Sequence, residues 1–514
     1  MSILYNLVRE IPGLRGMTNN GQILKYIDIV YNGDPNDITS GNIELVDKED
    51  LKELLQMGFY EGKIKKILPA LNVINNSFNK KNLSRFTNLD LADNLVNKYG
   101  KIYGWHPTDK FLFPCNRYGN FAIKVIIKLM NSKSMKKFIK DEYQRYKYII
   151  ENQICITEEG AVNNFIYTLL VDNGKQFSNK IFSGNFLKSN KLTKNKFTAI
   201  FIDPEYISSI PKRCDSSTYD YTYQDFILKS TEYSDVVVGI TPANWMQTNS
   251  SKLKKLINFR NYIKEGNHLK LINYYDLNSD YVNDNFLSNN GGISTFIYDK
   301  NHNGECFMFD KIVDLSKLDI IPTKIDNLEL LYFLKDFCAK NGSLNDIFDG
   351  SCGSLRTKDT RLFSRSRSNS AAIRVSKRSK DRYGVKGREF LFCDNNALKQ
   401  CELKNKDKWK VLVAETCSSA GKGLSSNISV SNPGELYTNS FGVFIVDSKN
   451  SAESLVSYLK TEFVNETIGK FKIKNHINRD ILKYIPKVPL NIKWTNSGVK
   501  KYLKIDKYEK TKKD

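Results

Sequence analysis

The tetrapeptide Asp-Pro-Glu-Tyr at residues 203–206 carries the residue types needed to hold and modify an aromatic amine. Residues 199–206 read Ala-Ile-Phe-Ile-Asp-Pro-Glu-Tyr, so an apolar strand would end directly before Asp203. The Asp203 carboxylate and the Pro204 carbonyl can accept hydrogens from an exocyclic amine, and the ring of Tyr206 can stack on the attached base. The plainer alternative is a strand that runs into a proline turn, which Asp203 caps.

Three other segments also follow strand-like runs. Residues 114–121, Pro-Cys-Asn-Arg-Tyr-Gly-Asn-Phe, predict a strand–turn–helix whose glycine would let a cofactor approach the backbone near the helix's positive end. Glu158 or Glu159 follows an apolar run, and a carboxylate there can accept two hydrogen bonds from a ribose diol. Residues 239–245 close a further strand with Trp245, which is more typical of a core. A structural turn and an exposed loop glutamate are the alternatives for the first two segments.

The elements that would position these residues alternate between strand-like and helix-like from about residue 84 to 325. The strand-like runs lie at 111–113, 154–156, 199–202 and 236–240, and helix-like stretches lie at 121–130 and 223–231. This alternation predicts an α/β fold, with a parallel sheet that carries helices on both faces. Ligands of open α/β sheets bind outside the carboxyl ends of the strands, where the four segments would lie.

The charge of the chain points to a polyanionic partner. Its 78 Lys and Arg exceed its 56 Asp and Glu, which gives a net charge of +22. Such an excess is typical of proteins that bind nucleic acid or an acidic membrane surface. Residues 355–388 carry 12 basic residues against two acidic ones, with Ser and Arg interleaved, so we expect a loop-rich basic segment there. Contact of this segment with DNA is favoured over a solvated loop.

Cysteine and histidine usage indicates an intracellular protein without a metal. The nine cysteines form no Cys-x-x-Cys, which predicts reduced thiols in a cytosolic compartment. Four histidines without a close pair argue against a His-rich metal site. Residues 1–30 lack an apolar run behind basic residues, so no signal peptide is expected, and the longest apolar runs are too short for a membrane span.

Taken in order, these segments resemble the adenine-specific DNA methyltransferases of type II restriction–modification systems. The resemblance runs from about Arg85 to Pro489. Residues 114–121 are similar to the family's Pro-x-x-Gly-x-Gly-x-Phe loop, and residues 203–206 occupy the place of Asn/Asp-Pro-Pro-Tyr. Phe86-Thr87 with Leu91-Ala92-Asp93 resembles the segment before the loop, and further landmarks are similar at 184–187, 240–245, 259–260, 291–293, 408–411, 432–434 and 457–463.

The chain departs from the family's pattern at five positions. Asn88 stands for a Pro, Phe113 for an acid, Arg117 for the first loop Gly, Asn185 for an Asp and Glu205 for the second Pro. Arg117 is the most consequential, because it could strain or occlude the cofactor loop or reach the cofactor's carboxylate.

The resemblance implies S-adenosylmethionine as the cofactor and double-stranded DNA as the partner, with a cognate restriction endonuclease as a further partner that it allows. The implied catalytic residues are Asp203, Pro204 and Tyr206. The implied cofactor-binding residues are Phe86, Thr87, Pro114, Arg117, Gly119, Phe121, Glu158, Asn185 and Phe186. The expected DNA-binding residues are Arg356, Arg361, Arg365, Arg367, Arg374, Lys377 and Arg378. No metal or membrane is expected, and the location would be the cytoplasm of a bacterium or of a phage's bacterial host.

The implied architecture is a Rossmann-like, S-adenosylmethionine-dependent methyltransferase domain followed by a mixed α+β target-recognition domain. The expected parts are a helical region at 1–83, the catalytic domain at 84–325, the recognition domain at 326–490 and a basic tail at 491–514. Two other functions stay open. One is an impaired, methyltransferase-like DNA-binding protein that acts as a decoy, inhibitor or partner subunit, and the other is an RNA adenine methyltransferase.

Overall fold

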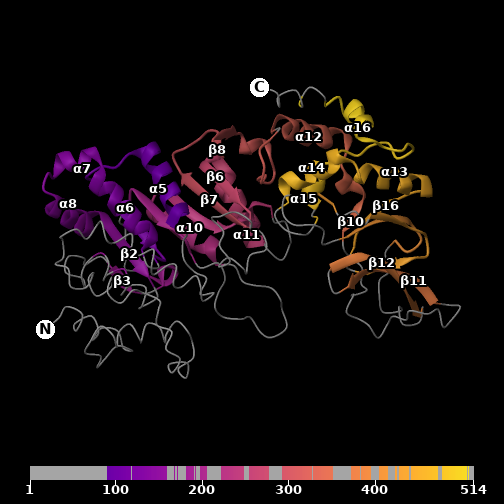
Figure 1. Ribbon diagram of the computed structural model, residues 1–514, viewed down its shortest axis with the longest axis horizontal. Coiled ribbons are helices and arrows are strands. Elements are labelled where there is room, and N and C mark those ends of the chain that lie inside the picture. Colours follow the sequence, from indigo (N-terminus) through magenta and orange to yellow (C-terminus); the bar gives the residue numbers. More distant parts are fainter. Residues whose placement is uncertain are drawn as a thin grey trace, which may run out of the picture. The chain divides into compact units, whose positions relative to one another are not determined.

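The structure is a computed structural model in which the placed residues begin at Leu89 (Figure 1). It describes residues 89–116, 119–158, 167, 171, 181–183, 185–189, 192, 197–204, 222–247, 254–276, 292–326, 328–350, 372–381, 384–394, 405–414, 423–424, 428–438, 441–472, 477, 479–505 and 508. The chain divides into two units. The first comprises residues 1–242 and 261–309, and the second comprises residues 243–260 and 310–514.

The first unit is built on a mostly parallel sheet with the order β3-β2-β1-β4-β5-β7-β6-β8, and the strand β9 beyond β8 consists of residues that belong to the second unit. The strands are β1 (Phe111–Pro114), β2 (Ile154–Glu158), β3 (Ile181–Ser183), β4 (Ala199–Ile202), β5 (Val236–Pro242), β6 (Leu269–Tyr275), β7 (Ile293–Asp299), β8 (Cys306–Met308) and β9 (Lys311–Val313). β1 to β5 pair in parallel, whereas β7 runs antiparallel between β5 and β6. Apart from β7, this is the Rossmann order 3-2-1-4-5-6. The predicted α/β, Rossmann-like fold class is confirmed.

Helices connect these strands and cover the sheet. They are α5 (Leu89–Tyr103), α6 (Asn120–Asn131), α7 (Lys133–Phe138), α8 (Glu142–Tyr148), η3 (Ile149–Gln153), η4 (Phe186–Lys188), α10 (Tyr223–Tyr233) and η7 (Glu265–Asn267). In addition, η5 (Ala243–Met246) belongs to the second unit and α11 (Lys254–Lys264) to both.

Both faces of the central strands are buried. On one face the ring of Phe201 lies 5.1 Å from that of Tyr99 in α5 and 5.7 Å from that of Phe121 in α6. The intervening residues Leu112 and Ile200 belong to the other face and are also fully buried. Continuous apolar runs are what a parallel sheet covered on both sides requires, which explains why these strands could be recognised in the sequence.

The second unit is a mixed α+β structure. Its four-stranded antiparallel sheet has the order β10-β16-β13-β14, and a three-stranded sheet has the order β12-β11-β15. The strands are β10 (Phe348–Gly350), β11 (Ala372–Asp381), β12 (Gly384–Asp394), β13 (Trp409–Ala414), β14 (Ile428–Ser431), β15 (Leu436–Tyr437) and β16 (Phe441–Val446). The helices are η9 (Leu315–Lys317), α12 (Leu328–Asn341), η10 (Leu344–Ile347), α13 (Lys449–Leu459), α14 (Glu462–Phe471), α15 (Arg479–Leu482) and α16 (Asn496–Leu503).

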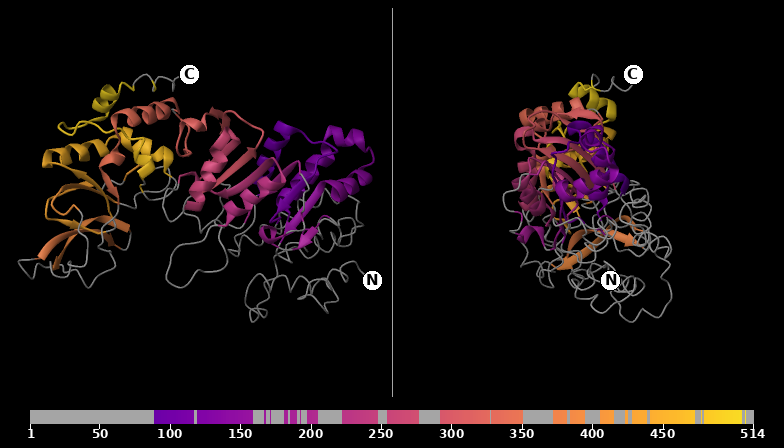
Figure 2. Two further views of the ribbon diagram at one scale, coloured as in Figure 1. Left: turned by 180° about the vertical axis from the view of Figure 1, so that it is seen from behind. Right: turned by 90° about the vertical axis from the view of Figure 1, so that its left-hand side faces the viewer.

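The four-stranded sheet has an apolar core on each face. Val411 and Phe444 join the helix-covered cluster of α13 and α14, while Leu412 and Val443 contribute to a smaller cluster with Tyr437 of β15. Figures 1 and 2 show α13 and α14 on one side of this sheet and the hairpin of β11 and β12 on the other.

The structure corrects one sequence-based expectation and leaves others as predictions. Part of the basic segment expected to be loop-rich forms strands, because β11 and β12 pair along their length. The expected helical region at 1–83 lies outside the described residues, and the four-part domain division stays a prediction. Within the part of the chain that the structure describes, no helix is both long and apolar enough to cross a membrane. The same residues include no group of three or more His, Cys, Asp or Glu that could hold a metal ion.

Candidate active site at the carboxyl ends of the strands

The carboxyl ends of β2, β1 and β4 lie next to one another in the sheet. Pro114 ends β1 and pairs with Thr157, and the next residue of β2 is Glu158, its last. On the other side, the β1–β4 register, continued by two residues, sets Pro114 beside Ile202, the last residue of β4. Neighbouring strands are about 4.8 Å apart. Cys115 and Asn116, which follow β1, therefore lie between Glu158 and Asp203 at the carboxyl ends of the strands.

This edge contains the topological switch point of the sheet. The chain passes from β1 to β2 on one side of β1, and β4 flanks β1 on the other side. At such a point a crevice opens outside the carboxyl ends of the strands, and open α/β sheets bind their ligands in it. The sequence-predicted segments after β1, β2 and β4 are thus brought together by the topology.

Helix α6 begins directly after Gly119, which is hydrogen-bonded to Asn116. The backbone N–H of Gly119 donates to the carbonyl of Asn116 at 2.8 Å, and Gly119 has a φ of 94° as the N-cap residue. A Cβ on Gly119 would lie 2.3 Å from a ring carbon of buried Tyr167. Both the positive φ and the close ring therefore require glycine here, and the turn brings the backbone to the positive end of α6.

Asn116 presents a buried amide without a hydrogen-bond partner. The residue is 7% exposed, and neither its Nδ2 nor its Oδ1 has a partner in the described structure. The same holds for the buried Thr157 Oγ1 on β2, whose backbone carbonyl accepts from the N–H of Cys115 at 2.9 Å. Burying an unpaired polar group costs about 1–3 kcal/mol, so these atoms fit a polar ligand.

Local backbone strain lies in the same turn. Cys115 has a φ of 56°, a left-handed conformation that residues with a Cβ rarely adopt. Strain of this kind costs about 1–3 kcal/mol and clusters at ligand-binding sites. The strained residue Cys115 directly precedes Asn116, whose amide has no partner among the described residues.

Two buried carboxylates flank the turn. Glu158 is 5% exposed and Asp203 is 6% exposed, and Pro204 after it is also buried. Each follows or ends an apolar strand, so the strand delivers a charged group to the edge of the sheet. Glu158, Asp203 and the Asn116 amide, which is unpaired among the described residues, thus supply acceptors for hydroxyl and amine donors at the carboxyl ends of the strands.

The segment after β3 is held by α10. The Oδ1 of Asn185 accepts from the N–H of Leu187 at 2.8 Å and thereby caps η4. The buried ring of Phe186 stacks on Phe226 with centroids 6.2 Å apart, and the Nζ of Lys229 lies 5.4 Å from its centroid. The predicted cofactor contacts of Asn185 and Phe186 stay predictions, and one lone pair of the Asn185 oxygen serves the cap.

Comparison with known proteins gives no sequence match. No family model matches this chain, and no curated protein matches it. Its matches are solved structures. A Listeria monocytogenes protein described as a class I S-adenosylmethionine-dependent methyltransferase is 12% identical, with a TM-score of 0.38 over 61% of this chain and 94% of that one.

Two further matches come from restriction–modification systems. The modification subunit of a type I restriction enzyme from Vibrio vulnificus is 9% identical, with a TM-score of 0.36 over 49% of this chain. The chain covers 53% of the length of that subunit. A type I methyltransferase subunit from Streptococcus thermophilus is also 9% identical, with a TM-score of 0.33 over 60% of this chain and 68% of that one.

Several predicted site residues lie outside the described part of the chain. These are Phe86, Thr87, Arg117, Tyr206, Arg356, Arg361, Arg365 and Arg367. Arg374, Lys377 and Arg378 lie in β11. Phe121 packs into the core on Phe201, and Trp245 is fully buried beside Phe259, as the sequence indicated for the tryptophan. Sequence reasoning missed Asn116 and Thr157 as candidates, although Asn116 is the second residue after β1 and Thr157 lies within β2.

In the second unit, a buried lysine joins two of the landmarks that carry the resemblance. Lys410 Nζ lies within hydrogen-bond distance of the backbone carbonyls of Asn405 at 3.3 Å, Lys406 at 3.1 Å, Lys408 at 2.7 Å and Asn432 at 3.1 Å, which share its three N–H donors. Burial lowers the pKa of Lys410 to about 8, against the attraction of Glu435 and Asp407. Segments 408–411 and 432–434 are therefore held together by a structural cation.

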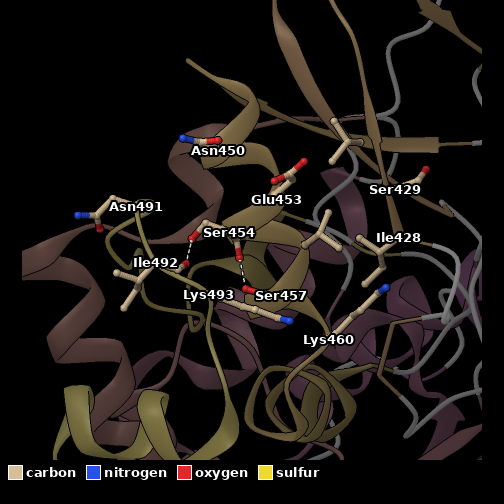
Figure 3. A pocket seen from close by; sticks show the side chains of 12 residues that line it. Ile428, Ser429, Asn450, Glu453, Ser454, Ser457, Lys460, Asn491, Ile492 and Lys493 are labelled. Atoms are coloured by element: carbon tan, nitrogen blue, oxygen red, sulfur yellow. Dashed lines mark hydrogen bonds between the residues drawn. The ribbon is translucent and has the colours of Figure 1, made fainter.

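A cavity of about 590 Å³ lies in the second unit among β14, α13 and residues 491–493 (Figure 3). Two of its serines bind backbone carbonyls: Ser454 Oγ donates to the carbonyl of Ile492, and Ser457 Oγ donates to that of Ser454 at 2.6 Å. These contacts stabilise the wall of the cavity. The residues that line the cavity include neither a buried acid nor a buried amide like those at the carboxyl ends of the strands in the first unit.

Proposed function

We propose that the first unit transfers a methyl group from S-adenosylmethionine to the exocyclic amine of an adenine in duplex DNA. The support is the placement of an acid, a following proline and an unpaired amide at the switch point of a Rossmann-like sheet. The order of motifs along the chain, which resembles adenine-specific DNA methyltransferases, agrees with that placement.

The observation that carries the proposal is the buried amide of Asn116, which has no hydrogen-bond partner among the described residues. An amide offers one acceptor and two donors, so it can bind both hydroxyl and carboxylate groups. Here it lies in the turn between Glu158 and Asp203, close to the amino end of α6. A cofactor with a carboxylate and a ribose matches this set of polar groups better than an apolar ligand does.

The residues that would hold S-adenosylmethionine surround the end of β1. Glu158 would accept hydrogen bonds from the ribose hydroxyls, and Asn116 would hold the amino-acid part near the amino end of α6. Phe186, fixed by α10, and Asn185 would border the adenine ring. When bound, the cofactor supplies an electrophilic methyl group on a sulfonium sulfur.

Asp203 and Pro204 would orient the target amine. The lone pair of an aromatic amine is delocalised into the ring, which makes it a weak nucleophile. The Asp203 carboxylate and the Pro204 carbonyl would accept its two hydrogens and turn the lone pair towards the methyl group, so the residues act by orientation and electrostatics. Asp203 would hold the amine proton as the new bond forms.

The target base has to leave the duplex before it can reach this edge of the sheet. Enzymes that modify a base inside DNA flip it out of the stack and read it in a pocket. Tyr206, three residues after Asp203, would stack on the extruded adenine. The net charge of +22 and the basic residues of the second unit would bind the phosphates of the flanking duplex.

Isothermal titration of the full chain with S-adenosylmethionine tests the proposal. We expect binding to the native chain and a loss of at least tenfold in affinity for N116A. The matched control is N152A, because Asn152 is exposed and its Nδ2 donates only to the carbonyl of Tyr148 in the described structure. Equal losses in both variants would contradict a ligand at Asn116.

The variant R117G, measured beside the native chain, separates an active enzyme from an impaired one. If the native chain gives no heat and R117G binds, the proposed enzyme is wrong and the chain is a methyltransferase-like DNA-binding protein. Binding by both supports the proposal, because the arginine then leaves room for the cofactor.

A further inference from the structure

The corner between helices α7 and α8 carries a dense group of lysines. Residues 133–140 read Lys-Ser-Met-Lys-Lys-Phe-Ile-Lys, with four basic residues and no acid. The four lysines are all exposed, and they are Lys133, Lys136, Lys137 and Lys140. The next two residues are acids in the start of α8, where Asp141 Oδ1 accepts from the N–H of Gln144 at 2.7 Å. We refer to the four lysines and Phe138 as the lysine corner.

The lysines of this corner lack the acidic neighbours that other surface lysines have. Lys128 Nζ lies 3.8 Å from Asp93 Oδ1, and Lys147 Nζ lies 4.0 Å from Glu151 Oε1. Among the residues that the structure describes, no carboxylate forms such an ion pair with any of the four corner lysines. Unpaired charges of one sign leave a positive potential on the surface, which attracts an acidic partner.

An exposed aromatic ring lies between Lys137 and Lys140. Phe138 is 54% exposed, which is the largest exposed fraction among the described aromatic side chains. Its ring lies 5.2 Å from that of Tyr148 in an edge-to-face arrangement, so Tyr148 supports the ring from one side. Covering an exposed phenylalanine gains about 1.5–3 kcal/mol. An aromatic side chain surrounded by polar residues is typical of the centre of a protein interface.

The backbone of the lysine corner is fixed by buried groups. Met135 of α7 is fully buried in the core of the first unit. Arg145 of α8 is also buried, and its Nη1 donates to the carbonyls of Ile139 at 2.8 Å and Lys140 at 3.0 Å. A surface that is already ordered loses less conformational entropy on binding, so this backbone is prepared for an interface.

The lysine corner lies at the amino ends of the strands. Helix α6 runs back from the carboxyl end of β1, and α7 and α8 lie beside it (Figure 1). Ser134 Oγ donates to the carbonyl of Trp105. Tyr148 Oη donates to the carbonyl of Pro107 at 3.1 Å, and both carbonyls belong to the segment before β1. The corner is therefore at the opposite end of the sheet from the candidate active site, and the proposed reaction does not use it.

We propose that the lysine corner binds an acidic segment of a partner protein. Carboxylates of the partner pair with the lysines, and an apolar side chain of the partner covers Phe138. Charge complementarity is the reason for an acidic partner, and the exposed ring is the reason for apolar residues beside the acids. This inference does not depend on the proposed function.

A protein fits this surface better than two other anionic partners do. Single nucleic-acid strands stack on several rings along a groove, whereas the corner offers one exposed ring. Insertion into a lipid surface needs a helix with a broad apolar face, whereas α7 has six residues and four of them are Lys or Ser.

Fluorescence anisotropy of the full chain with a labelled synthetic peptide of Glu, with Leu at every fourth position, tests the inference. We expect the native chain to bind this peptide and not the same peptide with Gln in place of Glu. K136A and K137A should each lower the affinity about threefold, as expected for one surface ion pair. F138A should lower it at least about fivefold, as expected for an interface anchor. K449A removes an exposed lysine on α13 and should bind as the native chain does.

The substituted side chains are exposed, so all variants should melt at the temperature of the native chain, and circular dichroism checks this. The inference is overturned if the native chain does not bind the Glu peptide, if K449A loses as much affinity as K136A, or if F138A binds as tightly as the native chain. It is also overturned if single-stranded oligothymidine, or vesicles of phosphatidylcholine and phosphatidylserine, bind with the same dependence on Phe138. The surface would then belong to nucleic acid or to lipid.

Discussion

At the residue scale, Asn116 is buried, lies next to the strained Cys115, and has an amide that no described residue satisfies. A residue that serves only the fold would satisfy its amide, because an unpaired buried polar group costs about 1–3 kcal/mol. The side chain is therefore better explained by a ligand than by stability.

Replacing Asn116 with leucine should separate stability from binding. N116L removes the unpaired amide at similar volume, so the free energy of unfolding should rise by about 1 kcal/mol while S-adenosylmethionine binding is lost. Urea denaturation and calorimetry measure the two effects. A loss of stability greater than about 1 kcal/mol would instead assign the amide a structural role.

Asp203 and Tyr206 are expected to act on the amine and the base only. D203A and Y206A should abolish methylation and change DNA affinity by no more than a few-fold, because phosphate contacts supply most of that affinity. Two measurements test this: incorporation of labelled methyl groups into DNA retained on a filter, and fluorescence anisotropy for DNA affinity. Persistent turnover by D203A would show that the site is assigned wrongly.

Sequence reasoning singled out Glu158 and Asp203, which the structure places at the carboxyl ends of the strands, but not the amide of Asn116, and the reason is physical. Glu158 and Asp203 stand at the ends of apolar strands, so their position follows from the hydrophobic pattern. Whether Asn116 finds a partner depends on which backbone groups surround it after folding. Likewise, the cap that Asn185 forms with Leu187 depends on the local turn and not on residue type alone.

At the element scale, the start of α6 depends on Gly119. In G119A the positive φ of 94° and the contact with Tyr167 both oppose a Cβ. The free energy of unfolding should fall by about 2–4 kcal/mol, measured by chemical denaturation. G434A is the matched control, because Gly434 also has a positive φ, 82°, but no atom lies within 4 Å of the position that its Cβ would take. If both variants lose the same stability, the contact with Tyr167 contributes nothing.

Lys410 ties the turn at 432–435 to the start of β13 through four carbonyls. K410M should lower the free energy of unfolding by about 1.5–3 kcal/mol, since it removes hydrogen bonds from a charged donor to the backbone. The control K408M changes an exposed neighbour and should stay within about 0.5 kcal/mol of the native chain. Thermal denaturation by circular dichroism compares the two, and equal melting temperatures for K410M and the native chain would contradict the role of Lys410.

The strands that could be predicted from the sequence are those whose two faces are both buried. Strands of the first unit are buried on both faces and read as continuous apolar runs, so they were predicted from the sequence. The β11–β12 hairpin was predicted as a loop because its distal half is polar on both faces, and the period of two is therefore hidden. Pairing with β12 and β15, rather than the sequence of β11 alone, makes it a strand.

At the scale of the whole molecule, the charge of +22 should make DNA binding strongly dependent on salt. Replacing Arg365, Arg367 and Arg374 with alanine together should weaken binding and reduce the salt slope by up to about one unit per lost phosphate contact. Fluorescence anisotropy at several salt concentrations measures the slope. An unchanged slope would move the DNA-binding surface to another part of the chain.

The most direct test of the central claim is transfer of a labelled methyl group from S-adenosylmethionine to nucleic acid, followed by digestion and identification of the nucleosides. The native chain should place the label on the exocyclic nitrogen of adenine in duplex DNA, with none in structured RNA and none with D203A. No label above that of D203A, or label in RNA at the level of DNA, would contradict the proposed activity.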